Sequence, residues 1–301
     1  MTFLDRAIAR ALPLVPRSVV QRVAARYIAG EELPDACRVV RSLNGAGKLG
    51  TLDVLGEEVK TEAEAAEIVR SYLEALAELD RLGLRAGVSV KPTALGLELG
   101  AELCRTNLET IARAAAERRR FVRIDMEDSS TTSGTLAVYR ELRERGLDNV
   151  GIVLQARLRR TLDDARSLAD LRPDVRLCKG IYLEGEAVAY QDDGAVGESF
   201  VRIAEVLLDS GGRVAFATHA DRLIVRARAL VQERGRAVHE FQLLLGVRPA
   251  LGDRLVAEGE RVRIYVPYGR RWYEYSLRRL QENPRMATMI ARDLLRRPKR
   301  R

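Results

Sequence analysis

Short apolar runs rich in β-branched residues alternate with longer stretches of helical periodicity from about residue 50 onward. The runs predict eight strands, at residues 51–56, 87–92, 121–126, 150–156, 175–183, 213–219, 239–246 and 262–267. Thr61 and Glu64 form a capping-box pattern at the start of one intervening helix. This alternation predicts an α/β fold, a (β/α)8 TIM-like barrel. An open doubly wound sheet is the alternative, but the even spacing favours closure and no strand is followed by a GxGxxG pattern.

The two ends of the chain depart from this alternation. Residues 1–45 predict extra N-terminal helices, two amphipathic helices interrupted by prolines. We expect the barrel to span residues 46–290 and a basic tail to occupy residues 291–301. The last ten residues contain six Lys or Arg and one Asp, which is typical of a solvated end or of a weak attachment to acidic lipid.

The composition is typical of a soluble globular protein that can bury a substantial core. The chain has 301 residues, of which 47% are hydrophobic and 31% charged. The formal charge is +8, and because the tail supplies +5 of it, the rest of the chain is only mildly basic. Without a basic stripe that carries exposed aromatic residues, we expect no nucleic-acid partner.

The cysteines and histidines are too few and too scattered for a disulfide framework or a His-rich metal site. Cys37, Cys104 and Cys178 lie far apart without a CxxC pair, and the chain has only two histidines. We therefore expect no metal and a reducing, cytoplasmic setting. No uncharged stretch approaches the roughly 20 residues of a membrane span, so we expect at most peripheral attachment to the inner face of the cell membrane.

One stretch is a near miss to a phosphate-binding loop. In SLNGAGKLGT, Ser42 stands where the first glycine of that motif belongs, and Leu49 replaces the Ser or Thr that follows Lys48. We interpret the stretch as the turn into the first strand.

Polar side chains at the predicted strand ends are the first candidates for chemistry, because reactive groups of such barrels lie at the carboxyl ends of the strands. In this chain those ends carry Lys91, Asp125, Gln155, Lys179, Tyr182, His219, Gln242 and Tyr265. Two chemistries stay open: Lys91 or Lys179 as a Schiff-base nucleophile of an aldolase or lyase, or a polar rim that holds a cofactor. A third interpretation, a non-enzymatic adaptor for membrane or nucleic acid, is supported only by the arginine-rich ends of the chain.

The segment at residues 263–284 adds a candidate carboxylate clamp. It predicts a strand, a glycine-containing loop and a helix that carries Arg278 and Arg279 side by side, with Glu282 on the same face as Arg278. Such a guanidinium pair suits bidentate hydrogen bonds to a carboxylate. A solvated helix face in an arginine-rich protein is the alternative.

Seven segments resemble the proline dehydrogenase family, in the family's order: VSVKPTALGL (88–97), RIDMED (123–128), VLQARLRRT (153–161), RLCKGIYLE (176–184), FATHAD (216–221), EFQLLLGV (240–247) and RIYVPYG…YSLRRLQENP. The length is similar to that of the monofunctional bacterial form. The resemblance implies a (β/α)8 barrel that holds FAD at its mouth and oxidises L-proline to Δ1-pyrroline-5-carboxylate, the first step of proline catabolism to glutamate. It implies hydride transfer from the proline Cδ to flavin N5, a membrane quinone as electron acceptor, and a pyrroline-5-carboxylate/glutamate-semialdehyde dehydrogenase as the partner that uses the product.

The resemblance also implies roles for individual residues. The catalytic residues would be Asp125 and Arg176, with Arg176 donating to the flavin edge near N5. The substrate would be bound by Lys91, Tyr182, Leu244, Tyr265, Arg278 and Arg279. The flavin would be bound by Asp125, Met126, Gln155, Arg176, Lys179, Gly180, Ile181, Thr218, His219, Gln242 and Glu282. Glu57 would form a gate with Arg278 over the bound proline.

Overall fold

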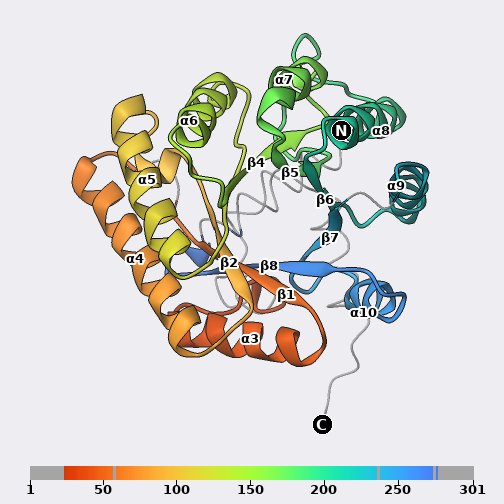
Figure 1. The fold of residues 1–301 in the computed structure, drawn as a ribbon. Helices are drawn as coiled ribbons and strands as arrows, with labels where there is room; N and C mark the ends of the chain where they lie inside the picture. Colours follow the sequence, from red (N-terminus) through yellow and green to blue (C-terminus); the bar gives the residue numbers. More distant parts are fainter. Residues whose placement is uncertain (1–23, 57–58, 236–237, 274–275, 277–301) are drawn as a thin grey trace, which may run out of the picture.

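A closed barrel of parallel strands forms the centre of the molecule in the computed structural model, which describes residues 24–56, 59–235, 238–273 and 276. The strands are β1 Leu49–Val54, β2 Ala86–Val90, β3 Val122–Ile124, β4 Val150–Gln155, β5 Asp174–Cys178, β6 Arg213–Ala217, β7 His239–Leu244 and β8 Val262–Tyr268. Each strand pairs in parallel with its neighbour in the sequence, and β8 closes the barrel on β1 (Figure 1). The predicted (β/α)8 fold is confirmed, and each predicted run overlaps one strand.

The fifth predicted run exceeds its strand by the widest margin. The fifth run was expected to extend to residue 183, but β5 ends at Cys178. Gly180 has a φ of +93°, a left-handed conformation that breaks the extended backbone at this point. The residues after the break leave the sheet and form the loop that leads to the next helix.

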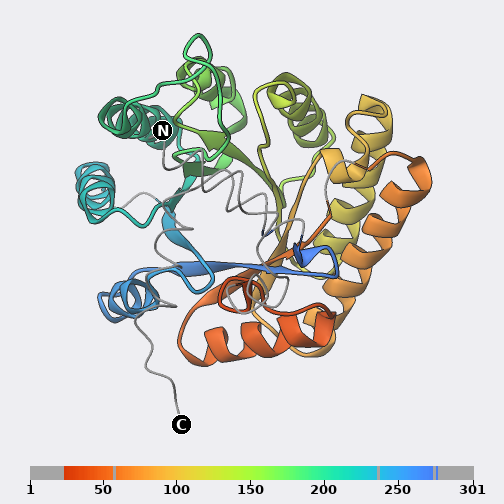
Figure 2. The same cartoon turned by 180° about the vertical axis from the view of Figure 1, so that it is seen from behind.

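Helices surround the barrel on the outside, as the two opposite views show (Figure 1; Figure 2). They are α3 Leu33–Gly45, α4 Glu62–Arg81, α5 Ala101–Glu117, α6 Thr132–Glu144, α7 Thr161–Ser167, α8 Asp193–Asp209, α9 Asp221–Glu233 and α10 Pro249–Ala257, with short 3-10 helices η2 Thr93–Leu95 and η3 Ala169–Leu171. Half of the predicted capping box of α4 is confirmed: the Thr61 side chain accepts a hydrogen bond from the Glu64 backbone N–H at 3.2 Å, but the Glu64 carboxylate accepts from the Lys60 N–H, one residue before the cap. In the described part of the chain, no helix has the length and apolar character that a membrane crossing requires.

Helix α3 confirms the second of the two predicted N-terminal helices; the first falls outside the described residues. Pro34 lies in its first turn, where the missing N–H costs nothing. The helix packs against β8 and β1 and so covers the seam at which the barrel closes. The proposed domain boundary between residues 45 and 46 stays a prediction.

The stretch that resembles a phosphate loop is a turn between α3 and β1. Helix α3 ends at Gly45, and the Asn44 side chain donates to the Lys48 carbonyl at 2.9 Å. Lys48 itself is buried and forms an ion pair with Asp253 of α10. The lysine therefore stabilises helix packing, as expected of a structural turn.

Side chains alternate between the helix layer and the barrel interior along each strand. Outward residues such as Leu52, Val88 and Ile124 are buried against the helices in one continuous core. Inward residues are largely polar, and Thr51 is hydrogen-bonded to Ser89 at 3.0 Å inside the barrel. TIM barrels usually fill this space with branched apolar residues. Here the interior is a polar network.

A segment near the start of the described chain lies along the carboxyl ends of β8 and β1. The Ala29 N–H donates to the Pro267 carbonyl at 2.9 Å, and the Gly269 N–H donates to the Gly30 carbonyl at 3.0 Å. A small apolar cluster, separate from the main core, joins this segment to both strands: Ala24, Ile28, Leu55 and Trp272. The two ends of the described chain are therefore packed together beside the mouth of the barrel.

Candidate functional site

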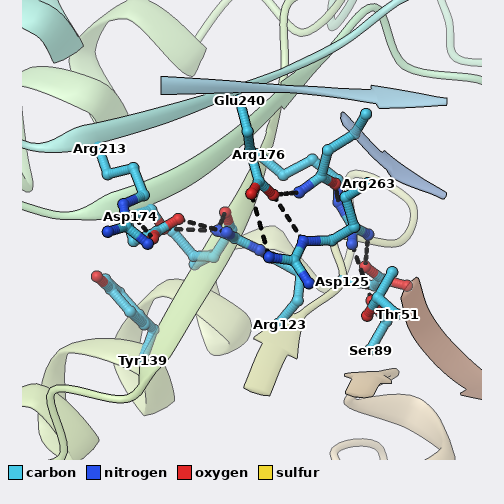
Figure 3. A network of polar contacts seen from close by, with 12 residues as sticks. Thr51, Ser89, Arg123, Asp125, Tyr139, Asp174, Arg176, Arg213, Glu240 and Arg263 are labelled. Carbon is cyan, nitrogen blue, oxygen red and sulfur yellow. Dashed lines mark hydrogen bonds and ion pairs between the residues drawn. The ribbon is translucent and has the colours of Figure 1, made fainter. Parts of the chain in front are cut away.

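Four ion pairs between described residues lie in the barrel interior, and several of them appear together in Figure 3. The pairs are Lys91–Asp53 at 2.6 Å, Arg176–Asp125 at 2.6 Å, Arg263–Glu240 at 2.7 Å, and Arg123–Asp174. Charges removed from water need a partner of opposite sign, and here each buried cation has one. The interior is therefore close to neutral overall and rich in fixed dipoles.

Asp125 and Arg176, the two predicted catalytic residues, are in direct contact at the carboxyl end of the barrel (Figure 3). The second oxygen of Asp125 accepts a hydrogen bond from the Tyr265 hydroxyl at 3.0 Å. Arg176 also donates to Ser89 at 2.9 Å and to the side-chain oxygen of Gln242, and its guanidinium lies 5.3 Å from the centre of the Tyr265 ring. Burial lowers the pKa of Arg176, an effect that Asp125 opposes, and an arginine so paired stays charged. The arrangement holds one guanidinium rigidly at the mouth.

Lys91 and Asp53 form the second ion pair at this end. Lys91 is only 2% exposed and Asp53 is completely buried. The Lys91 Nζ also lies 3.5 Å from the Tyr265 hydroxyl, which connects this pair to Asp125. Burial raises the pKa of Asp53, and the charge of Lys91 opposes that rise. Sequence reasoning predicted Lys91 but missed Asp53.

Glu240 sets the orientation of the Gln242 amide. A carboxylate only accepts hydrogen bonds, so the Gln242 amide nitrogen donates to Glu240, at 2.6 Å, and its oxygen faces Arg176. Burial raises the pKa of Glu240, but Arg263 and Gln242 outweigh it and bring that pKa down to about 2. Glu240 is therefore ionised at neutral pH. It was also missed from the sequence, together with Arg263.

The predicted flavin residues on the other side of the mouth come from four neighbouring strands. Gln155 ends β4, Lys179, Gly180 and Ile181 follow β5, Thr218 and His219 follow β6, and Gln242 lies on β7. The Gln155 amide donates to the Glu127 carbonyl at 2.6 Å. A Cβ on Gly180 would lie 2.8 Å from the Gln155 side-chain oxygen. This contiguous arc of amide, ammonium, hydroxyl and imidazole groups, with a glycine where a side chain would collide, fits a flat ring that carries several hydrogen-bonding atoms.

His219 and Met126 differ in what they contribute to this arc. The His219 Nε2 accepts a hydrogen bond from the Leu244 backbone N–H at 3.1 Å. Burial and the nearby Arg248 lower the pKa of His219 to about 4. Met126 is buried within the main apolar core and offers a packing surface.

The predicted substrate wall is partly open. Leu244 is 45% exposed, and Tyr182 and Tyr265 are half-buried. The loop that carries Tyr182 is tied across the mouth by Glu184, which accepts hydrogen bonds from both the backbone N–H and the hydroxyl of Ser129, each at 2.7 Å. Arg278, Arg279, Glu282 and Glu57 lie outside the described residues, so the clamp and the gate stay predictions.

Comparison with known proteins gives consistent matches over nearly the whole chain. The sequence profile described as "Proline dehydrogenase" matches residues 36–292. The chain is 38% identical to "Proline dehydrogenase" of Deinococcus radiodurans, over 93% of this chain and 92% of that protein. It is 37% identical to "Proline dehydrogenase 1" of Bacillus subtilis, over 90% of each.

A solved structure supports the same relationship. The structure of proline utilization A (PutA) from Bdellovibrio bacteriovorus inactivated by N-propargylglycine superimposes with a TM-score of 0.81 and is 26% identical. The match covers 87% of this chain and 33% of that longer chain. The similarity therefore extends to the barrel as a whole.

Proposed function

We propose that this chain, which belongs to the proline dehydrogenase family and is therefore an oxidoreductase of proline catabolism, uses a bound FAD to oxidise L-proline to Δ1-pyrroline-5-carboxylate. Membership of this family replaces the Schiff-base lyase and the non-enzymatic adaptor as explanations of the polar mouth. The observation that carries the proposal is the contact of Asp125, Arg176 and Tyr265 at the carboxyl end of the barrel. Such a rigid polar centre is where this fold performs its chemistry.

The arc on β4 to β7 would hold the flavin. Lys179 would donate to the ring edge, Gln155 and Gln242 would form amide hydrogen bonds with it, and Gly180 would leave room for it. Met126, Ile181, Thr218, His219 and Glu282 complete the proposed binding set. When bound, FAD supplies a hydride acceptor at N5 of its ring. Arg176 would place a fixed positive charge beside that atom, where it stabilises developing negative charge without reorganising, and Asp125 would hold the guanidinium in place.

The other half of the mouth would bind proline. Lys91, with Arg278 and Arg279, would pair with the substrate carboxylate through charge-assisted hydrogen bonds. Tyr182, Leu244 and Tyr265 would enclose the pyrrolidine ring and exclude water from it. Glu57 would close over the bound substrate by pairing with Arg278.

The products determine the proposed partners. Electrons would pass to a membrane quinone, and the product would go to a pyrroline-5-carboxylate/glutamate-semialdehyde dehydrogenase. A cytoplasmic protein that meets a membrane quinone needs contact with the inner face of the membrane. The basic residues 291–301 would supply a weak electrostatic attachment there.

A visible absorbance spectrum of the purified protein tests the proposal. We expect the yellow absorbance of a bound flavin and its loss when L-proline is added without oxygen. Replacement of Arg176 by Met should prevent this bleaching, because the cation beside the ring is lost. Arg166→Met is the matched control, since Arg166 is exposed on α7 and pairs only with Asp163 among its described contacts; it should bleach like the parent protein. A colourless protein, or a flavin that proline does not reduce, would show that the proposal is wrong.

A further inference from the structure

We propose that Asp53, to which neither the family motifs nor the predicted site assigns a role, is the positioning residue that holds Lys91 in the substrate pocket and maintains its charge there. The inference rests on the proposed function, in which Lys91 binds the proline carboxylate. Four observations on the described residues support it: burial, geometry, the support behind the pair, and an unsatisfied oxygen.

Burial makes a counter-charge for Lys91 necessary. With 2% of its surface exposed, the Lys91 ammonium has lost its hydration, and an isolated ammonium in this position would favour its neutral form. Asp53 is the described carboxylate within ion-pair distance, at 2.6 Å. Asp125 lies on the same side of the barrel, but its two oxygens are engaged by Arg176 and Tyr265.

Asp53 holds Lys91 from the interior of the barrel, on the side away from the mouth. Asp53 lies within β1, opposite Ser89 of β2 and Pro267 of β8, so its backbone is fixed on both sides. Lys91 follows β2 directly and its side chain begins closer to the mouth. An ammonium has three N–H donors, and Asp53 uses one of them from the barrel side. The carboxylate thereby sets how far the ammonium can move toward solvent.

A buried tyrosine supports the pair from the helix layer. The Tyr72 hydroxyl of α4 donates to the Ser89 carbonyl at 2.7 Å and accepts from the Val54 N–H at 3.3 Å. These bonds join β1, at the residue after Asp53, to β2, two residues before Lys91. The backbone that carries the pair is therefore braced from the helix layer.

One oxygen of Asp53, Oδ2, is buried and has no hydrogen-bond partner among the described residues. The nearby Tyr265 hydroxyl only helps to lower the pKa of Asp53, whereas both oxygens of Asp125 and of Glu240 are bonded directly. A carboxylate in this condition costs stability compared with an apolar residue of similar size. We infer that the chain has an acidic residue at position 53, despite the loss of stability, because this residue maintains the position and charge of Lys91.

A double-mutant cycle on the flavin-loaded enzyme tests the inference. We expect Asp53→Asn to raise the KM for proline roughly tenfold or more, with flavin content unchanged and kcat reduced much less. Lys91→Met should raise KM by at least as much. If Asp53 acts through Lys91, the double variant Asp53→Asn/Lys91→Met should have the same KM as Lys91→Met alone. Asp174→Asn, which breaks a comparable ion pair with Arg123, is the control and should leave KM unchanged.

The outcomes separate this inference from the proposed function. If the wild-type chain oxidises proline and Lys91→Met raises KM, the function stands. The inference is then overturned if Asp53→Asn leaves KM unchanged, or if it raises KM as much in the Lys91→Met background as in the parent. If Asp53→Asn folds poorly, the double variant still tests the inference, because it removes both buried charges. A KM for the double variant above that of Lys91→Met alone overturns the inference.

Discussion

His219 must be neutral for the contact it makes. Its Nε2 accepts the Leu244 backbone N–H, and an imidazolium has no lone pair to accept with. Burial, reinforced by Arg248, lowers its pKa from the usual 6.5 to about 4. The ring therefore carries its proton on Nδ1 at neutral pH. His219 therefore presents its Nδ1–H at the mouth as an uncharged hydrogen-bond donor.

This depressed pKa predicts acid sensitivity. The unfolded chain binds a proton at His219 below about pH 6.5 and the folded chain only below about 4, so the stabilisation is present above pH 6.5 and is lost as the pH falls toward 4. Between pH 7 and pH 5 this residue should lower the free energy of unfolding by about 2 kcal/mol. Urea denaturation at the two pH values measures it. His219→Gln should remove that part of the pH dependence, whereas His239→Gln, at the other end of the barrel, should retain it.

The charged interior explains which residues the sequence could predict. Lys91, Asp125 and Gln242 were found because the carboxyl ends of parallel strands converge on one mouth, whatever lies between them. Asp53 and Glu240 lie deeper, where a TIM barrel is normally apolar, and no rule of strand ends points to them. A signal was present in the strict alternation of polar and apolar residues in runs such as TLDV and EFQL. That alternation is unusual in buried parallel strands and marks a polar interior.

The loop between β5 and α8 is the element that shapes the proposed flavin side of the mouth. Gly180 turns the chain out of β5 with a φ of +93°, beside the Gln155 side chain. Farther along, Glu184 ties the loop to Ser129, and Ala189 pairs with Leu158 in an isolated bridge. The apolar run in the sequence continued past Gly180, which is why the predicted strand was too long. The turn depends on backbone conformation, which periodicity does not report.

Replacement of Gly180 by Ala should disturb this side of the mouth. The left-handed conformation costs a residue with a Cβ about 1–3 kcal/mol, and the new atom would press on the Gln155 oxygen from 2.8 Å. We expect a lower melting temperature and less flavin bound per protein, measured by absorbance after gel filtration. Gly185→Ala is the matched control in the same loop, because its Cβ would meet nothing within 4 Å. Full flavin occupancy in Gly180→Ala would contradict the role given to this turn.

Contacts between the two ends of the described chain secure the seam at which β8 closes on β1. The eight-strand alternation predicted a barrel, and register and helix packing confirmed it. The packing of residues 24–32 over the β8–β1 seam was not predictable, because no local pattern links Glu31 to Trp272. Their hydrogen bond of 2.7 Å spans almost the full described length. Contacts at such separation arise only once the barrel has closed.

Trp272 should therefore matter for both stability and substrate binding. It is buried against Ala24, Ile28 and Leu55, and its indole N–H donates to Glu31. Trp272→Ala should lower the free energy of unfolding by about 3–5 kcal/mol, the usual cost of emptying a buried aromatic site. Trp272→Phe should cost less, since it keeps most of the apolar contact.

The same substitution should weaken proline binding, because the chain continues from Leu55 toward Glu57 and from Trp272 toward Arg278, the proposed gate and clamp. We expect Trp272→Ala to raise the KM for proline more than it lowers kcat, measured at a temperature where the variant is folded. Arg270→Ala is the control, since the Arg270–Glu32 ion pair in the same segment is exposed and worth little. If Trp272→Ala loses stability but keeps the parent KM, the cluster secures the barrel seam without positioning the clamp.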